Sequence, residues 1–211
     1  MSLDAVYGAI LDGDASAAAD AVQQALAAAV PAEEILNLAC ILAMSEIGRL
    51  YEEGIAFVPE MLISARAMRS AMGVLRPVLV QENVKPVGTV VIGTVSGDLH
   101  DIGKSLVAMM LEGAGFQVID LGVDVPPTRF AQEAAASNAQ VVAMSALLTT
   151  TMPAMKTTID ILAEGGLAGR VKTLIGGAPI SQAYADQIGA DGFAPDASRA
   201  ARKARELVGS A

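Results

Sequence analysis

The chain has 211 residues, of which 53% are hydrophobic and only 3% aromatic, and its formal net charge at pH 7 is -9. This length suits one large domain or two small ones, and the acidic balance argues against nucleic-acid binding, which requires a basic face. The mean hydropathy is positive, but no stretch offers the about 20 uncharged, mostly apolar residues of a membrane-spanning helix.

The N-terminal part of the chain has the periodicity of helices. It begins Met1-Ser2-Leu3-Asp4 without the basic segment of a signal peptide, so we expect a cytoplasmic protein. Gly13 ends a first amphipathic helix, and Asp14 is a suitable N-cap for a second. Four helices with short connections predict a small bundle that forms an N-terminal domain of residues 1–85. The expected helices span about residues 3–11, 14–30, 31–53 and 59–81.

From residue 86 onward, short apolar runs alternate with helical segments. This alternation predicts a flavodoxin/Rossmann-like, five-stranded parallel sheet with flanking helices, in a second domain of residues 86–211. Ligands of such sheets bind at the carboxyl ends of the strands, near a switch in strand order, so we expect a site directly after the first strand. The expected strands are 89–95, 117–121, 141–146, 171–175 and 192–194, and the expected helices are 101–114, 127–137, 152–164, 181–188 and 197–208.

His100, the single histidine of the chain, lies in the run Gly97-Asp98-Leu99-His100-Asp101-Ile102-Gly103 after the first expected strand. Neutral imidazole is the commonest metal ligand in proteins, and a carboxylate two residues earlier can fix its tautomer and raise its basicity. His100 is therefore a candidate metal ligand with Asp98 as its partner. The alternative is a surface or capping histidine without a ligand.

This run resembles the Asp-x-His-x-x-Gly signature of cobalamin-binding proteins, in which a histidine replaces the displaced nucleotide base on cobalt. Further segments match the same family in order, namely Asp120–Pro126, Ser145–Met152 and Ile175–Pro179. The helical part resembles the cap domain of methionine synthase and of methyltransferase corrinoid proteins, with the marker Ile47–Pro59 followed by Ser64–Met68. The resemblance covers nearly the whole chain.

The resemblance implies roles for three residues. His100 is the lower axial ligand of the cobalt in cobalamin, Asp98 hydrogen-bonds the other ring nitrogen, and a hydroxyl group supports Asp98. Methionine synthase has a serine for this last role, and the matching residue here is Thr151, which keeps the hydroxyl and adds a methyl group. Protonation of this relay favours Co(I), and deprotonation favours methyl-Co(III).

The resemblance also implies a set of cofactor contacts. Glycines allow close approach of the displaced nucleotide tail, Ser145 and Thr149 lie beside the tail, and Tyr51 and Val58 cover the methyl-bearing face of the corrin. Tyr51 stands where the family usually has phenylalanine. Alternatives are ordinary turns for the glycines, a backbone hydrogen bond for Ser145 and bundle core for Val58. The expected contacts are Gly97, Asp98, Leu99, His100, Asp101, Gly103, Ser145, Leu147, Thr149, Gly176, Gly177, Tyr51 and Val58.

By resemblance, the chain is a corrinoid protein that carries a methyl group on cobalt. A substrate-specific methyltransferase loads it, and a second methyltransferase passes the group to tetrahydrofolate or a thiol. We expect a carrier subunit rather than a complete enzyme, a reductive activator as a further partner, and neither nucleic acid nor membrane as a partner. The sequence does not name the methyl donor.

Three other functions are alternatives. Small subunits of adenosylcobalamin mutases resemble residues 88–211 but lack this type of cap. A cobalamin-dependent sensor would carry a DNA-binding segment before the cap. A phosphoacceptor or flavin domain on the same scaffold would need clustered carboxylates or aromatic residues, and the exit of the first strand offers only Ser96-Gly97-Asp98.

Overall fold

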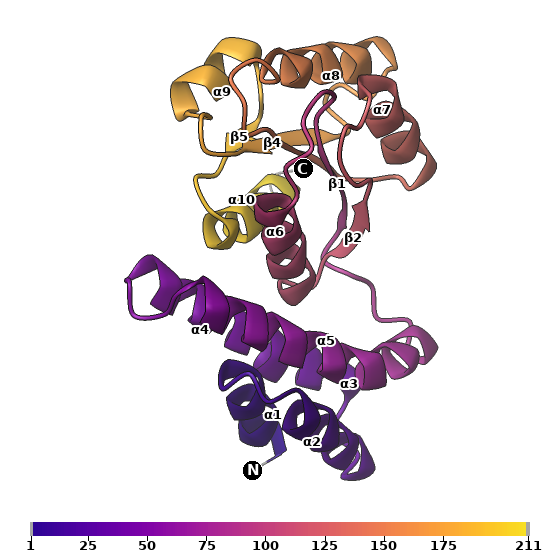
Figure 1. Ribbon diagram of the computed structural model, residues 1–211. Coiled ribbons are helices and arrows are strands. Elements are labelled where there is room, and N and C mark those ends of the chain that lie inside the picture. The colour runs from indigo at the N-terminus through magenta and orange to yellow at the C-terminus, as the bar shows by residue number, and fades with distance from the viewer. Residues whose placement is uncertain (1, 210–211) are drawn as a thin grey trace. The chain divides into compact units, whose positions relative to one another are not determined.

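A computed structural model describes residues 2–209 of the chain and divides it into two compact units (Figure 1). One unit runs to Pro86 and also includes Gly113–Gly115, and the other comprises Val87–Glu112 and the chain from Phe116 onward. Among the described residues, no helix combines the length and the apolar character that a membrane crossing requires.

The first unit is helical. Asp14 caps α2, because its carboxylate accepts the backbone N–H groups of Ser16 and Ala17 at 3.1 and 3.0 Å. At the start of α5, the Glu60 side chain accepts the N–H of Phe57 at 3.0 Å. The elements are α1 (Ser2–Leu11), α2 (Ala15–Ala27), α3 (Ala32–Ile35), η1 (Leu36–Cys40), α4 (Ile41–Glu52) and α5 (Val58–Gln81).

The third predicted helix differs from a regular α-helix, because the π-helical turn η1 joins α3 to α4. Buried residues recur at intervals of four along this segment, at Ala32, Leu36, Cys40, Met44 and Gly48. An α-helix advances about 100° per residue, so a four-residue repeat turns away from the core by about 40° at each step. The wider π turn offsets part of this rotation and keeps the buried residues on one side.

The second unit contains a five-stranded, all-parallel sheet in the order β2-β1-β3-β4-β5, which confirms the predicted fold class. In the register, Thr94 of β1 stands beside Ser145 of β3, and Ser145 stands beside Gly176 of β4. The strands are β1 (Thr89–Thr94), β2 (Gln117–Asp120), β3 (Val141–Ser145), β4 (Lys172–Gly176) and β5 (Gly192–Phe193).

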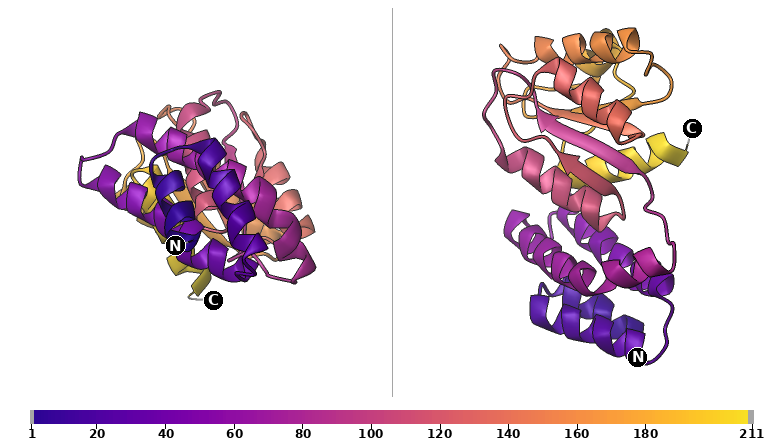
Figure 2. Two further views of the ribbon diagram at one scale, coloured as in Figure 1. Left: turned by 90° about the horizontal axis from the view of Figure 1, so that it is seen from below. Right: turned by 90° about the vertical axis from the view of Figure 1, so that its right-hand side faces the viewer.

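Helices cover both faces of this sheet, α6 and α10 on one face and α7, α8 and α9 on the other (Figures 1 and 2). Both faces are therefore apolar, as is usual for parallel sheets. Phe130 of α7 and Met155 of α8 are fully buried against the sheet. Gly93 makes room for the Phe130 ring, which a Cβ atom at that position would meet at 2.8 Å. The helices are α6 (Ile102–Gly113), α7 (Pro127–Ala136), α8 (Pro153–Glu164), α9 (Gln182–Ile188) and α10 (Ala197–Gly209).

Candidate functional site

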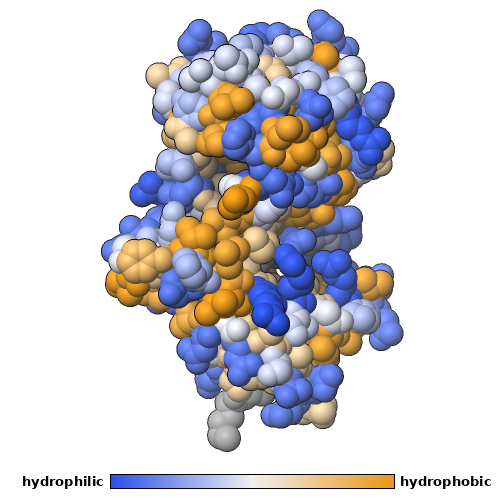
Figure 3. All heavy atoms as spheres, in the orientation of Figure 1, coloured by the Kyte–Doolittle hydropathy of each residue, from blue (hydrophilic) through white to orange (hydrophobic). Residues whose placement is uncertain are grey.

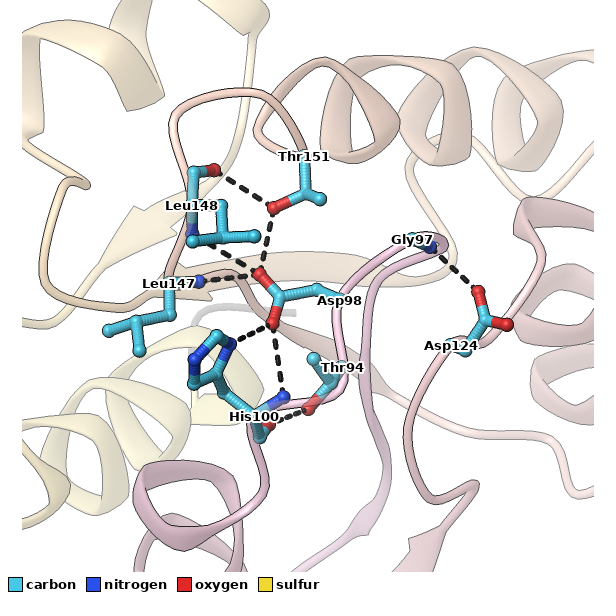
Figure 4. Close-up of polar contacts among 8 residues, drawn as sticks. All are labelled: Thr94, Gly97, Asp98, His100, Asp124, Leu147, Leu148 and Thr151. Carbon is cyan, nitrogen blue, oxygen red and sulfur yellow. Dashed lines mark hydrogen bonds and ion pairs between the residues drawn. The ribbon is translucent and has the colours of Figure 1, made fainter.

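Two loops at the carboxyl ends of β1 and β3 bring the main predicted residues together (Figure 4). Asp98 and His100 lie in the loop from β1 to α6, and Thr151 lies in the loop from β3 to α8. These two strands are neighbours, but the helices that follow them lie on opposite faces of the sheet (Figure 2). From the ends of these two strands, the chain therefore continues towards opposite faces of the sheet. This is the point where the strand order switches and where open sheets of this class bind ligands.

The carboxylate of Asp98 is fully buried and receives hydrogen bonds from both loops. Its Oδ2 accepts the N–H groups of Leu147 and Leu148 at 2.8 and 3.2 Å and the hydroxyl of Thr151 at 2.8 Å. Its Oδ1 accepts the backbone N–H of His100 at 3.1 Å and lies 2.6 Å from Nδ1 of the same residue. The side chain of Asp98 thus fastens the two loops to each other.

This set of donors determines the charge of Asp98. Burial by itself raises the pKa of the carboxyl, because a charge is unfavourable away from water. The hydrogen bonds from Leu147, His100 and Thr151 lower it by more, so the pKa of Asp98 lies far below its ordinary value of 3.8. Asp98 is therefore an anion, and it accepts a hydrogen bond from Nδ1–H of the imidazole.

The imidazole of His100 is fixed on one side and open on the other. With the proton on Nδ1 and directed at Asp98, the lone pair of the neutral ring is on Nε2. Nε2 points away from Asp98 (Figure 4) and makes no hydrogen bond with any residue from 2 to 209. Half of the side-chain surface of His100 is exposed. His100 can therefore offer Nε2 as a neutral nitrogen ligand to a metal ion that a bound cofactor brings to the surface of the protein.

Apolar side chains stand exposed on both loops around His100, and Figure 3 shows hydrophobic patches on the surface of this unit. Leu99 and Ile102 are 73% and 86% exposed, and Leu147 and Leu148 are each nearly half exposed. Exposed apolar groups of this size around a free ligand atom mark a binding site for a large, partly apolar molecule. A corrin ring ligated by His100 fits this description.

The glycines of the site differ in their surroundings. A Cβ atom on Gly103, in the first turn of α6, would meet nothing within 4 Å, so the packing of the described chain does not require glycine there. In contrast, Gly177 has a φ of +131°, and a Cβ atom on it would overlap the carbonyl oxygen of Ala146. The turn alone explains Gly177, whereas the open space at Gly103 fits the close approach of a ligand.

The remaining predicted residues fall into two groups. Ser145 is half-buried at the end of β3, and its hydroxyl makes no hydrogen bond within the described part of the chain, which excludes the alternative of a backbone partner. Thr149 is exposed in the loop after β3. Tyr51 and Val58 belong to the helical unit, and Val58 is 37% exposed, so it is not a core residue of the bundle.

Three contributors to this site were missing from the sequence-based prediction. The buried hydroxyl of Thr94 donates to the carbonyl of His100 at 2.8 Å. Asp124, from the loop after β2, accepts the N–H of Gly97 at 2.7 Å. The buried ammonium of Lys104 pairs with Asp120 and, at 2.9 Å, with Asp101. Polar residues next to strand ends were the available signal, but their partners depend on the register of the sheet.

Comparison with known proteins identifies related chains. A family model described as a B12 binding domain matches residues 88–202, and a second model of the same description matches residues 2–76. The chain is 44% identical over 189 residues to dimethylamine corrinoid protein 3 of Methanosarcina acetivorans. The aligned region covers 90% of this chain and 88% of that protein.

Two further relatives extend the comparison. Trimethylamine corrinoid protein 1 of Methanosarcina acetivorans is 42% identical over 202 residues, with 95% of this chain and 94% of that protein covered. The methanol:cobalamin methyltransferase complex MtaBC from Methanosarcina barkeri contains a similar structure, with a TM-score of 0.86, 29% identity, and coverage of 100% of this chain and 80% of that chain.

Proposed function

Because the chain belongs to the family of B12-binding corrinoid proteins, we propose that it carries a methyl group on the cobalt of a bound cobalamin between methyltransferases. One observation supports this most directly: Asp98 holds Nδ1 of His100, and Nε2 is left free among exposed apolar side chains. When bound, cobalamin supplies a cobalt that can accept a methyl group and give it up.

Within this proposal the residues of the chain have separate tasks. His100 would hold the cobalt through Nε2, and the ionised Asp98 would keep the proton of the imidazole on Nδ1. Thr151 and the two N–H groups of Leu147 and Leu148 would keep Asp98 ionised and in place. Tyr51 and Val58 would cover the opposite face of the corrin, as the resemblance implies. Gly97, Leu99, Asp101, Gly103, Ser145, Thr149, Gly176 and Gly177 would contact the cofactor and its tail.

Corrinoid proteins of this family work with methyltransferases, as the MtaBC complex illustrates. We infer two such partners for this chain, one specific for the methyl donor and one that passes the group to tetrahydrofolate or a thiol, together with a reductive activator. Relatives named for dimethylamine and trimethylamine support a methylamine as the first donor to test.

The ligation by His100 can be tested with isotopes. Protein labelled with ¹⁵N and loaded with unlabelled hydroxocobalamin is reduced to Co(II), and its electron paramagnetic resonance spectrum is recorded. Ligation by His100 gives each cobalt line a doublet splitting from ¹⁵N, whereas the cofactor's own base gives a triplet from ¹⁴N. We expect a doublet for the wild type and its loss in His100→Ala.

A control variant changes an exposed charge that makes no hydrogen bond or ion pair with Asp98, His100 or Thr151, namely one that pairs along its own helix. Lys156→Ala on α8 removes a side chain that is about half exposed and pairs only with Asp160 on the same helix, so this variant should give the wild-type doublet. A triplet in the labelled wild type would mean that the base stays on cobalt and would exclude His100 as the ligand.

The carrier role is tested by a methylation assay. The reduced, cobalamin-loaded protein is mixed with a trimethylamine, a dimethylamine or a methanol methyltransferase in turn, each with its own substrate. We expect one donor to produce the methylated cofactor, seen in the absorption spectrum. Reactivity with none of the donors, despite a ¹⁵N doublet, would argue for a sensing rather than a carrying role.

A further inference from the structure

Asp124, in the loop between β2 and α7, makes two hydrogen bonds to one short segment of the His100 loop. Its carboxylate Oδ1 accepts the N–H of Gly97 at 2.7 Å, and its own N–H donates to the carbonyl of Asp98 at 3.0 Å. The hydroxyl of Ser96 lies 3.4 Å from the same Oδ1. Figure 4 shows Asp124 on the opposite side of this segment from Thr151.

These bonds complete a two-sided attachment of Asp98. Its side chain is held by the loop after β3, and its main chain is held by Asp124 from the loop after β2. The backbone turns sharply at this point, since Gly97 has a φ of +81°. Apart from its bond to Asp124, the main chain of Asp98 makes one other hydrogen bond within residues 2–209, from its N–H to the carbonyl of Val95 at 3.1 Å.

A residue at position 124 must meet two requirements, one for its backbone conformation and one for its side chain. The backbone φ is +52°, a conformation that disfavours most residues with a Cβ atom and that Asp and Asn tolerate better than other non-glycine residues. The side chain must also present an oxygen acceptor to Gly97. Glycine satisfies only the first requirement and alanine satisfies neither, whereas asparagine satisfies both.

We propose that Asp124 is a positioning residue that holds the Gly97–Asp98 peptide so that the Asp98 carboxylate meets Nδ1 of His100. Its effect on a bound cobalt depends on the proposed function, but its effect on the imidazole does not. Because His100 is the single histidine, the ¹⁵N signals of its ring can be followed in the cofactor-free protein without interference.

The test measures the ratio of the Nδ1–H and Nε2–H tautomers of the neutral His100 ring, and the hydrogen exchange of the Gly97 amide. The wild type should show the proton mainly on Nδ1. Asp124→Gly and Asp124→Ala should each shift the tautomer ratio and accelerate Gly97 exchange about tenfold, as expected for loss of the hydrogen bond that the Gly97 N–H donates. Asp124→Asn should retain the wild-type signals.

Asn138→Ala provides the matched control, because Asn138 has a φ of +51° but lies in the turn between α7 and β3. It should leave the His100 signals unchanged. If Asp124→Ala does not fold, the tautomer ratio and the Gly97 exchange rate of Asp124→Gly decide whether the proposal holds. Wild-type tautomer and exchange in Asp124→Gly would overturn the proposal, because the backbone conformation alone would then suffice. Failure of the wild type to bind cobalamin would instead refute the proposed function and leave this result intact.

Discussion

At the scale of single residues, the buried carboxylate of Asp98 is the centre of the site. Removing an isolated carboxylate from water costs several kcal/mol, but here five donor groups, four of them on Leu147, Leu148 and His100, surround its two oxygens. Three of these donors are backbone N–H groups, whose positions the loops determine. The charge on Asp98 is therefore a property of the fold.

The contribution of Asp98 to stability should depend on pH. Its pKa is lower in the folded protein than the ordinary 3.8, so the unfolded chain binds more protons in the acid range. The stabilisation is complete above this ordinary value and is lost as the pH falls below it. Urea unfolding of the wild type and of Asp98→Asn should show a difference in free energy that narrows towards acid pH. A difference in the free energy of unfolding that stays constant with pH would contradict a lowered pKa of Asp98 in the folded protein.

Thr151 offers a second test at this scale. Replacing it by valine removes the hydroxyl that donates to Asp98 and leaves one lone pair of a buried charge without a donor. We expect Thr151→Val to lower the free energy of unfolding by about 1–3 kcal/mol. Thr151→Ser keeps the donor and should recover most of this loss in the same urea titration. A loss in Thr151→Ser as large as that in Thr151→Val would contradict the prediction, because serine keeps the hydroxyl donor.

At the scale of elements, the site results from the strand order. The alternating apolar runs from residue 86 predict parallel strands, and the run Gly97–Gly103 after the first strand predicts the site, because such sheets bind ligands at strand ends. The pairing of Asp98, His100 and Thr151 followed from family resemblance. The hydrogen bonds from Asp124 to Gly97 and Asp98 did not follow from any pattern in the sequence. They depend on the pairing of Val95 with Val125. The π turn was likewise missed, since periodicity gives the buried side of a helix and not its hydrogen bonds.

Lys104 connects α6 to the end of β2 through its ion pairs. We expect removal of the cation to destabilise the protein less than removal of the two anions that pair with it. Its side chain is 2% exposed, whereas the side chains of Asp101 and Asp120 are 55% and 37% exposed. In Lys104→Met, both carboxylates can turn to water. In the double variant Asp101→Asn/Asp120→Asn, the buried cation remains without an anion, which costs about 3–5 kcal/mol. Chemical denaturation should show the double variant to be the less stable of the two.

The exposed pair of Lys156 and Asp160 on α8 is a control for this comparison. Both side chains are about half exposed, and Lys156→Met should change the free energy of unfolding by less than about 1 kcal/mol. If Lys104→Met proved as destabilising as the double variant, the expected asymmetry would be contradicted, because loss of the two ion pairs would then cost as much as an unpaired buried cation.

At the scale of the whole molecule, the chain consists of two units that separate family models match. Every hydrogen bond to the side chains of Asp98 and His100 comes from residues 98–151 of the second unit. The boundary between residues 85 and 86 stays a prediction about independent folding, and a fragment can test it.

We expect a fragment of residues 87–211 to unfold cooperatively on its own, because it contains the whole sheet and the helices on both faces. Loaded with hydroxocobalamin and reduced, the ¹⁵N-labelled fragment should show the same doublet as the full chain. Circular dichroism during heating measures the cooperativity. A fragment that is folded but gives no doublet would mean that ligation by His100 needs the helical unit.

The hydrogen bonds of Asp98 also have a consequence for the order of events during synthesis. Its partners Leu147, Leu148 and Thr151 lie 49, 50 and 53 residues further along the chain, so the ribosome makes Asp98 and His100 long before the groups that hold the Asp98 carboxylate in place. Contacts this distant in sequence form late in folding. We therefore expect a nascent chain halted before Leu147 to lack a fixed Asp98 carboxylate, so that the imidazole is held for a metal only after the third strand has been made.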